Sequence, residues 1–444
     1  MRSRRRSIAP FPAESISIFV TGRVPGADPG HNASMNIAKY TLSLLCAVLA
    51  GCQPDTPSAE APELEVPAAA GAMAPNLATG PDGTVVLSWI EPAAEGHELR
   101  YSTLGPGGWD ESGTVARGDN WFVNWADFPS VVPLSDSLWA AHWLQSQPAG
   151  GYAYDVKVAL SGDGGASWSE PFLPHTDGTP TEHGFVTLFP DAGGLGLVWL
   201  DGRKMVNEFD MNDVAASGMT LRAATFGVDQ LPIRESLIDG LTCDCCQTDV
   251  AITRTGPIAV YRDRTVDEVR DIYVSRRDYG EWQDGIPVSA DNWEIPACPV
   301  NGPIIRARDD DVVVAWFTAA NDRPMVKAAR SSDGGQSFSE PVVLNTEAPL
   351  GHIGAELMPD GSFVVAWHRR EGNGAASLVA RRLSPSGNLS DVLAIEEASD
   401  IFAFSVPQVA RANDALVLAW TNEVNNVYSI GSTLIPLDRF TTPR

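Results

Sequence analysis

Seven short apolar runs, each ending on an aromatic residue, form the clearest pattern in this chain of 444 residues. Small and β-branched residues dominate the runs, as is typical of buried strands. The runs end at Trp89, Trp143, Trp199, Tyr261, Trp316, Trp367 and Trp420, so that successive aromatics lie 51 to 62 residues apart. A long repeat that holds several short strands is typical of a β-propeller. We therefore predict an all-β fold, a β-propeller of seven blades, with six blades as the alternative.

Each repeat fits one plan: an inner strand, a Gly/Asp turn, the aromatic-ended strand, a variable loop and two outer strands. The modules run over residues 76–116, 127–174, 185–238, 248–289, 302–344, 353–395 and 406–437. The last module shows only three clear strands. A strand from the other end of the chain often closes such a ring, and Glu63–Val66 is the candidate.

Two copies of a glycine-rich motif lie between outer strands, as SGDGGASW and SDGGQSF. Both resemble the Asp-box of the sialidase (BNR-repeat) superfamily, and the resemblance implies a sialidase-like β-propeller. We expect the aspartates to cap backbone N–H groups, the glycines to supply positive φ, and the aromatics to fill the blade. The structural positions are Asp163, Trp168, Asp333 and Phe338. Asp-boxes occur in propellers that hydrolyse sialosides and in many that do not.

The chain departs from that family where catalysis is concerned. Sialidases carry an Arg-Ile-Pro motif near the first strand, whereas Met73–Leu77 reads MAPNL here. No Tyr–Glu nucleophile pair is assignable, because Tyr261 occupies the aromatic core position. If the protein is an enzyme, the resemblance implies a glycoside hydrolase of the exo-sialidase type. Asp263 and Glu268 are the candidate acid and base.

The N-terminal region resembles a bacterial lipoprotein precursor. An apolar run ends in Leu49-Ala-Gly-Cys52, a lipobox pattern in which Cys52 is the lipid attachment site. Residues 1–34 are then a non-native extension, 35–51 a signal peptide, 52–70 a flexible tether and 71–444 the propeller. The expected location is the bacterial cell envelope, either periplasmic or at the cell surface.

The formal net charge of the chain is −25. Because like charges repel, this value disfavours nucleic acids and anionic lipid surfaces as partners and leaves the lipid anchor as the only membrane contact. Solubility is the simplest role of the acidic residues. The more specific alternative is that acidic loops bind structural calcium. We expect a monomer.

Unusual polar residues fall in the loops after the aromatic-ended strands and in the links between modules. Scaffold-held loops of one face are the usual place for a site. The candidate ligand-binding residues are Asp201, Arg203, Arg262, Arg264, Arg270, Trp293 and Arg369. Arginine forks match a carboxylate, and the family resemblance implies an arginine clamp on an acidic sugar. The alternative is that these arginines pair with neighbouring acidic groups such as Asp271.

Four further cysteines are Cys243, Cys245, Cys246 and Cys298. In an exported protein they predict one or two disulfides, including one from Cys298 to the other three. Thiols in this Cys-x-Cys-Cys pattern with a fourth nearby would also ligate zinc or copper(I).

The leading functional interpretation is recognition of an anionic glycan or another anionic small ligand, with hydrolysis of the glycan as its extension. The first alternative is a protein-binding or scaffold propeller without catalysis. The second is a metal-dependent propeller enzyme that uses the cysteines.

Overall fold

The aromatic-ended strands are buried along most of their length in the computed structural model, which describes residues 63–205, 214–372, 374–396 and 401–441. All described residues belong to one compact unit, Ala59–Arg444. The predicted extension, signal peptide and Cys52 lie outside the described residues. Among the residues that are described, no helix is long and apolar enough to cross a membrane.

Seven antiparallel sheets form the fold, one for each repeat. The first contains β1 (Met73–Thr79), β2 (Val85–Pro92), β3 (His97–Gly105), β4 (Gly108–Trp109) and β5 (Gly113–Gly118). The second contains β6 (Ser130–Pro133), β7 (Trp139–Ser146) and β8 (Tyr154–Ser161). The third contains β9 (His183–Asp191), β10 (Gly194–Asp201), β11 (Thr220–Phe226) and β12 (Pro232–Asp239). The fourth contains β13 (Asp249–Ile252), β14 (Pro257–Arg262), β15 (Ile272–Asp278), β16 (Glu281–Trp282) and β17 (Ile286–Pro287).

The remaining three sheets complete the set. The fifth contains β18 (Ile304–Arg308), β19 (Asp311–Thr318), β20 (Met325–Ser331) and β21 (Val342–Asn345). The sixth contains β22 (Pro349–Leu357), β23 (Phe363–Arg370), β24 (Ala376–Leu383) and β25 (Leu393–Glu396). The seventh contains β26 (Gln408–Ala412), β27 (Ala415–Val424) and β28 (Val427–Pro436). Short helical turns are η1 (Arg203–Met205), α1 (Val214–Ser217), η2 (Ala320–Asp322) and η3 (Leu437–Arg439).

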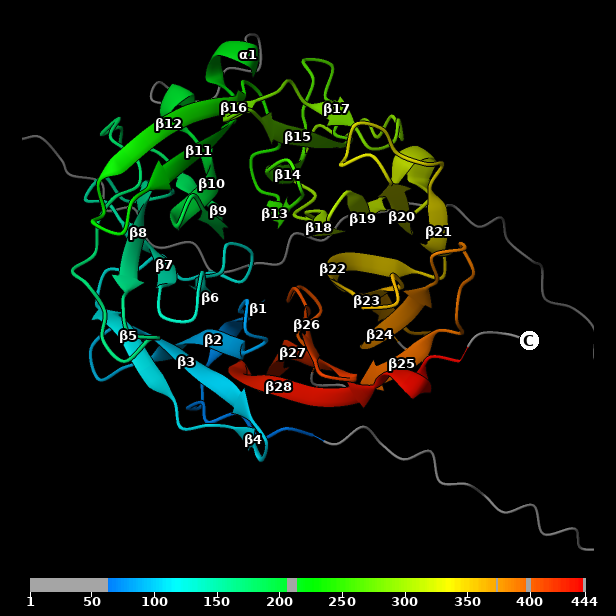
Figure 1. Ribbon diagram of the computed structural model, residues 1–444, viewed down its shortest axis with the longest axis horizontal. Coiled ribbons are helices and arrows are strands. Elements are labelled where there is room, and N and C mark those ends of the chain that lie inside the picture. The colour runs from blue at the N-terminus through cyan, green and yellow to red at the C-terminus, as the bar shows by residue number, and fades with distance from the viewer. Residues whose placement is uncertain (1–62, 206–213, 373, 397–400, 442–444) are drawn as a thin grey trace, which may run out of the picture. The chain divides into compact units, whose positions relative to one another are not determined.

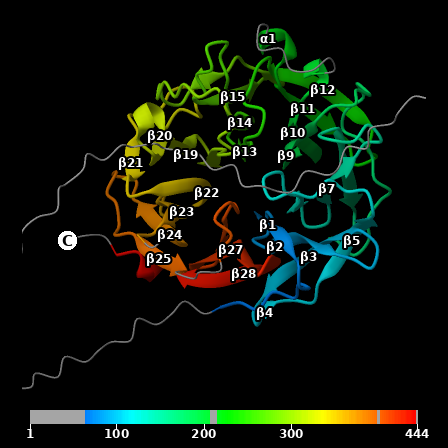
Figure 2. The same ribbon diagram turned by 180° about the vertical axis from the view of Figure 1, so that it is seen from behind.

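The sheets stand in a ring, with the first strand of each nearest the centre (Figures 1 and 2). The predicted seven-bladed β-propeller is therefore confirmed. Apolar residues of neighbouring sheets pack together, because each sheet has two faces that must be covered.

The seventh blade is closed by the N-terminal segment, as the sequence predicts. Glu63 forms an antiparallel bridge with Thr433, and the Leu64 N–H donates to the Ser432 carbonyl at 2.8 Å. Leu64 and Val66 also pack against the core between the first and seventh blades. The ring thus includes residues from Glu63 onward, within the segment predicted as a tether.

Most of the buried aromatics have a polar partner for their N–H or O–H group. The indole N–H of Trp89 donates to Glu91 at 2.8 Å, and that of Trp199 donates to Asp201 at 2.8 Å. A buried indole N–H left unpaired would cost about 1–3 kcal/mol. In the first and third blades, the acidic residue two positions after the tryptophan is therefore part of the core.

The two Asp-box turns have the geometry expected from the motif. Asp163 accepts from the Ser167 N–H at 2.8 Å, and Asp333 accepts from the Ser337 N–H at 3.0 Å. Gly165 has a φ of 92°, a conformation that favours glycine. The turns join outer strands and contribute to the scaffold.

Removal of Glu63–Val66 is expected to destabilise the protein. A chain that begins at Pro67 loses the closing backbone bonds and the burial of Leu64 and Val66, for a loss of about 2–3 kcal/mol in the free energy of unfolding. Urea unfolding of this chain and of a control that begins at Glu63 measures the difference. Superimposable curves would show that closure contributes no stability.

Candidate functional site

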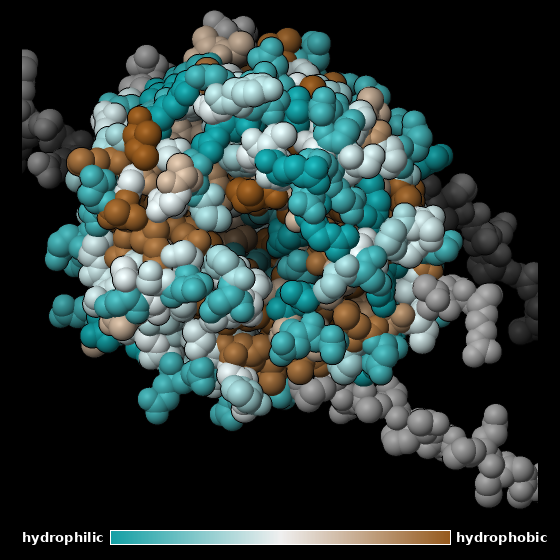
Figure 3. All heavy atoms as spheres, in the orientation of Figure 1, coloured by the Kyte–Doolittle hydropathy of each residue, from teal (hydrophilic) through white to brown (hydrophobic). Residues whose placement is uncertain are grey.

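The seven inner strands surround a cavity of about 210 Å³ at the centre of the ring. Its wall takes residues from every blade, among them Asn76, Asp127, Thr187, Asp249, Arg306, Ile353 and Gln408. In the space-filling view the centre is hollowed, and hydrophilic residues gather along part of its rim (Figure 3). Much of the polar lining is paired, since Arg306 donates to Asp249 at 2.7 Å.

A tyrosine and two carboxyl groups lie at the edge of this cavity. The Tyr154 hydroxyl lies 2.7 Å from Glu182 Oε1 and 3.1 Å from Asp127 Oδ2, within hydrogen-bond distance of both. Burial raises the pKa of Asp127 to about 8 and the pKa of Glu182 to about 7. Sequence reasoning missed this group, because Asp127 begins the second module, Glu182 lies in the link that follows it, and neither residue carries a motif.

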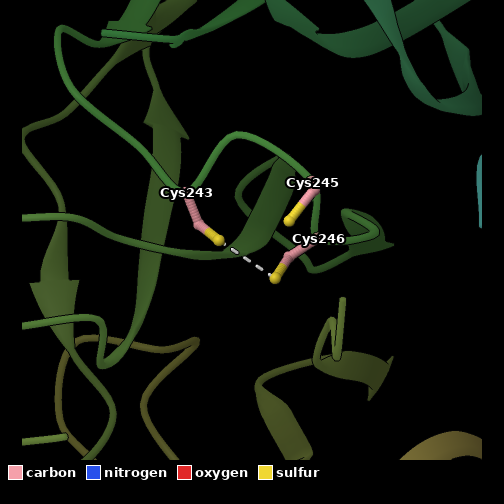
Figure 4. Close-up of side chains that lie close together, drawn as sticks. All are labelled: Cys243, Cys245 and Cys246. Atoms are coloured by element: carbon pink, nitrogen blue, oxygen red, sulfur yellow. Dashed lines mark hydrogen bonds between the residues drawn. The ribbon is translucent and has the colours of Figure 1, made fainter. Parts of the chain in front are cut away.

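The thiol cluster, defined as Cys243, Cys245 and Cys246, lies in the link between β12 and β13. The three Sγ atoms lie within 4.8 Å of one another, and Cys243 Sγ is 3.1 Å from Cys246 Sγ (Figure 4). The Cys243 N–H donates to the Arg262 carbonyl at 3.0 Å, which ties the link to the end of β14. The three cysteines of the cluster and Cys298 all have free thiols in the structure. The disulfide from Cys298 therefore stays a prediction.

Arg270 joins the thiol cluster to a carboxylate. Its Nη1 donates to Cys243 Sγ at 3.3 Å, and its Nη2 donates to Glu268 at 2.8 Å. Burial alone raises the pKa of Cys243. Hydrogen bonds from the other two thiols and the charges of Arg270 and Arg262 outweigh it, and they hold this pKa well below that of an ordinary cysteine.

The two candidate catalytic carboxyl groups differ in environment. Burial, with Asp239 as an added negative neighbour, raises the pKa of Asp263 to about 7. Burial also raises that of Glu268, but bonds from Arg264 and Arg270 outweigh it and lower the pKa. Glu268 also has a φ of 61°, a backbone conformation uncommon for a residue with a side chain.

Arg262 and Trp293 are buried beneath the rim. The Arg262 guanidinium donates to the carbonyl groups of Asn301, Arg270 and Phe317 at 2.7–3.1 Å. It also lies over the Trp293 ring, 4.9 Å from the centroid. Arg262 therefore connects the fourth and fifth blades.

The other arginines that were predicted to bind a ligand have acidic partners. Arg203 pairs with Asp201 at 2.6 Å and with Glu235 at 3.0 Å. Arg264 donates to Asp244 at 2.9 Å and also pairs with Glu268. Arg369 pairs with Glu371 at 2.8 Å. These contacts correspond to the alternative in which acidic neighbours neutralise the arginines.

Sequence reasoning also missed an aromatic group near the central cavity, formed by Trp125, Phe402 and Phe404. Trp125 packs edge-on to His352 at 5.6 Å and tilted against Phe404 at 5.6 Å, and Phe404 is 55% exposed. Phe402 lies 5.7 Å from Phe404. Both phenylalanines lie in the link before β26, outside the repeated strands, so no periodic pattern marks them.

Neither a family model nor a curated protein sequence matches this chain. Among solved structures, it is similar to a protein of unknown function from Dyadobacter fermentans, with 14% identity and a TM-score of 0.45 over 85% of this chain and 98% of the other. It is also similar to a Trypanosoma rangeli sialidase mutant that displays trans-sialidase activity, with 12% identity and a TM-score of 0.43. That match covers 76% of this chain but 56% of the sialidase.

An endo-arabinase from Bacteroides thetaiotaomicron is similar as well, with 13% identity and a TM-score of 0.37. The match covers 71% of this chain and 95% of the arabinase. At these identities the likeness concerns the fold alone.

We expect Arg262→Ala to act on stability. The substitution leaves buried carbonyl groups without a donor, so the free energy of unfolding should fall by about 3 kcal/mol or more. The exposed Arg370→Ala is the control, with an expected change within about 0.5 kcal/mol. Chemical denaturation measures both, and equal stability of the two variants would contradict a structural role.

Proposed function

We propose that this propeller is a metalloprotein that binds a thiolate-preferring metal ion, zinc or copper(I), through the thiol cluster. The convergence of three Sγ atoms within 4.8 Å of one another carries the proposal. A zinc–sulfur bond of about 2.3 Å places two ligand sulfurs of a tetrahedral site about 3.8 Å apart. The three Sγ atoms, all within 4.8 Å of one another, are close enough to share one ion after a small adjustment of the side chains.

The charges around the cluster support the same proposal. Metal-binding cysteines are deprotonated, and a buried thiolate needs nearby positive charge. Arg270 supplies that charge at 3.3 Å from Cys243 Sγ. Because Arg270 is also held by Glu268, its guanidinium stays directed at the sulfur.

Whether Cys298 is a ligand decides if the metal site is closed by four cysteines or open at its fourth position. Cys243 and Cys246 are buried, whereas Cys298 is exposed. Three cysteine ligands leave a fourth position of a tetrahedral site for Cys298, water or a substrate. We therefore place the access route at Cys298.

Metal titration of the reduced protein tests the proposal. We expect the thiol cluster to take up one zinc or copper(I) ion, and Cys243→Ser should weaken the affinity for that ion at least tenfold through loss of a ligand. Competition with a colorimetric chelator for each metal measures the affinities and shows which ion is preferred. Thr242→Ser, a change at the adjacent buried residue, is the matched control and should bind as the native chain does.

A disulfide is the competing outcome. Peptide mapping without reduction would then find Cys243 bonded to Cys246, or Cys298 bonded to the cluster. Such a bond in the native protein, together with no metal binding after reduction, would overturn the proposal.

Carbohydrate recognition is a second candidate, favoured by the aromatic group near the central cavity. Trp125 and Phe404 are close in sequence to residues that line the cavity, and Phe404 exposes its ring. Aromatic faces and a few directed polar groups are typical of small-ligand sites. In this function Asp263 would donate a proton to the leaving oxygen and Glu268 would act as the base.

A glycan array combined with a glycosidase screen tests this second candidate. Phe404→Ala should weaken binding of any retained glycan about tenfold while the melting temperature stays unchanged, whereas Val424→Ala, another exposed apolar residue, should change neither. Hydrolysis should decline as the pH rises through about 7, because Asp263 must be protonated to act as the acid. The absence of any retained glycan would dismiss this candidate without bearing on the metal site.

A further inference from the structure

Two histidines and three aspartates form a second polar cluster, between the second and third blades. His175 precedes β9, His183 begins it, and their rings stack in parallel at 3.9 Å between centroids. Asp155 and Asp177 lie beside the rings, and Asp201 ends β10. The thiol cluster shares none of these residues.

The hydrogen bonds of His183 fix its tautomer. Its Nδ1 lies 3.1 Å from the Thr181 carbonyl and 3.3 Å from the Tyr154 carbonyl, and both oxygens only accept. Nδ1 must therefore carry a proton. Its Nε2 then presents a lone pair to Asp177 at 3.2 Å and Asp201 at 3.8 Å, two further acceptors. A cation must lie among these atoms, either a proton or a metal ion.

His175 favours the metal ion. Its ring is buried, and Nε2 has no hydrogen-bond partner among the described residues. The nearest carboxylate oxygen, Asp155 Oδ1, is 3.6 Å away. This separation is too long for a hydrogen bond but close to the roughly 3.4 Å between two nitrogen or oxygen ligands of tetrahedral zinc. If a proton rather than a metal ion lies at His183, His175 Nε2 still has no hydrogen-bond partner.

The local charge points the same way. Arg203 contacts Asp177 and Asp201, but it also pairs with Glu235, which Arg222 shares. With neutral imidazoles, the two arginines face four carboxylates including Asp155, and two negative charges are left. A divalent cation compensates both.

We propose that His175 and His183, with Asp155, Asp177 and Asp201, bind a divalent transition-metal cation such as zinc. The ligand atoms fall into two groups that share His183, one with Asp155 and His175 and one with Asp177 and Asp201. Imidazole and carboxylate ligands suit zinc, and a His N–H donated to a carbonyl is the usual support of a metal ligand. This site is independent of the thiol cluster.

Cobalt(II) distinguishes the two sites, because thiolate ligands give an intense near-ultraviolet charge-transfer band and nitrogen or oxygen ligands do not. The full-length chain carrying Cys243→Ser and Cys246→Ser should bind one cobalt ion and show visible bands without that charge-transfer band. His175→Gln and His183→Gln in this background should each weaken cobalt binding about tenfold or more. His142→Gln is the matched control, since His142 is also buried but its side-chain partner among the described residues is Ser130.

Imidazole NMR of the cysteine-substituted chain gives a test that needs no histidine substitution. Zinc should shift the signals of His175 and His183 and leave that of His142 unchanged. Failure of this chain to bind cobalt, unchanged histidine signals with zinc, or equal affinity in all three histidine variants would each overturn the proposal. Protonation of His183 without any bound metal ion would likewise overturn the proposal. None of them affects metal binding by the thiol cluster.

Discussion

Burial of one aromatic side chain at the end of the second strand of each blade is the constraint on which this ring depends. A tryptophan fills the space between sheets, and its buried N–H is stabilised where an acceptor is available in the core. Glu91 and Asp201 provide that acceptor two residues after Trp89 and Trp199. The carboxylates at the strand ends are therefore fixed first by packing, and the loops that follow start from positions set by the core.

Asp201 shows how this constraint reaches the rim. Its carboxylate accepts from Trp199 and pairs with Arg203, and it lies 3.8 Å from His183. The same residue thus belongs to the core, to an ion pair and to the histidine cluster. Such sharing explains why a loop arginine is better described as part of a network than as a free group for an incoming anion.

The thiol cluster and the histidine cluster differ in the chemistry they offer. Sulfur ligands next to Arg270 suit a soft ion, whereas imidazole and carboxylate ligands suit a borderline divalent ion. The thiol cluster lies in the link between β12 and β13, whereas the histidine cluster combines His175 and Asp177 of a link with strand residues Asp155, His183 and Asp201. Link residues held by rigid strands thus contribute to both clusters.

The sequence by itself determined the blade count, the closing role of Glu63–Val66 and the turn chemistry of the Asp-boxes, because these features depend on periodicity and on contacts within a repeat. It also identified the cysteines and arginines, but not their partners. Arg262 bonds to Phe317, 55 residues away, and Arg264 to Asp244, 20 residues away. Only the packing of adjacent blades brings such loops together, so the tertiary structure alone decided which charges are neutralised and which thiols converge.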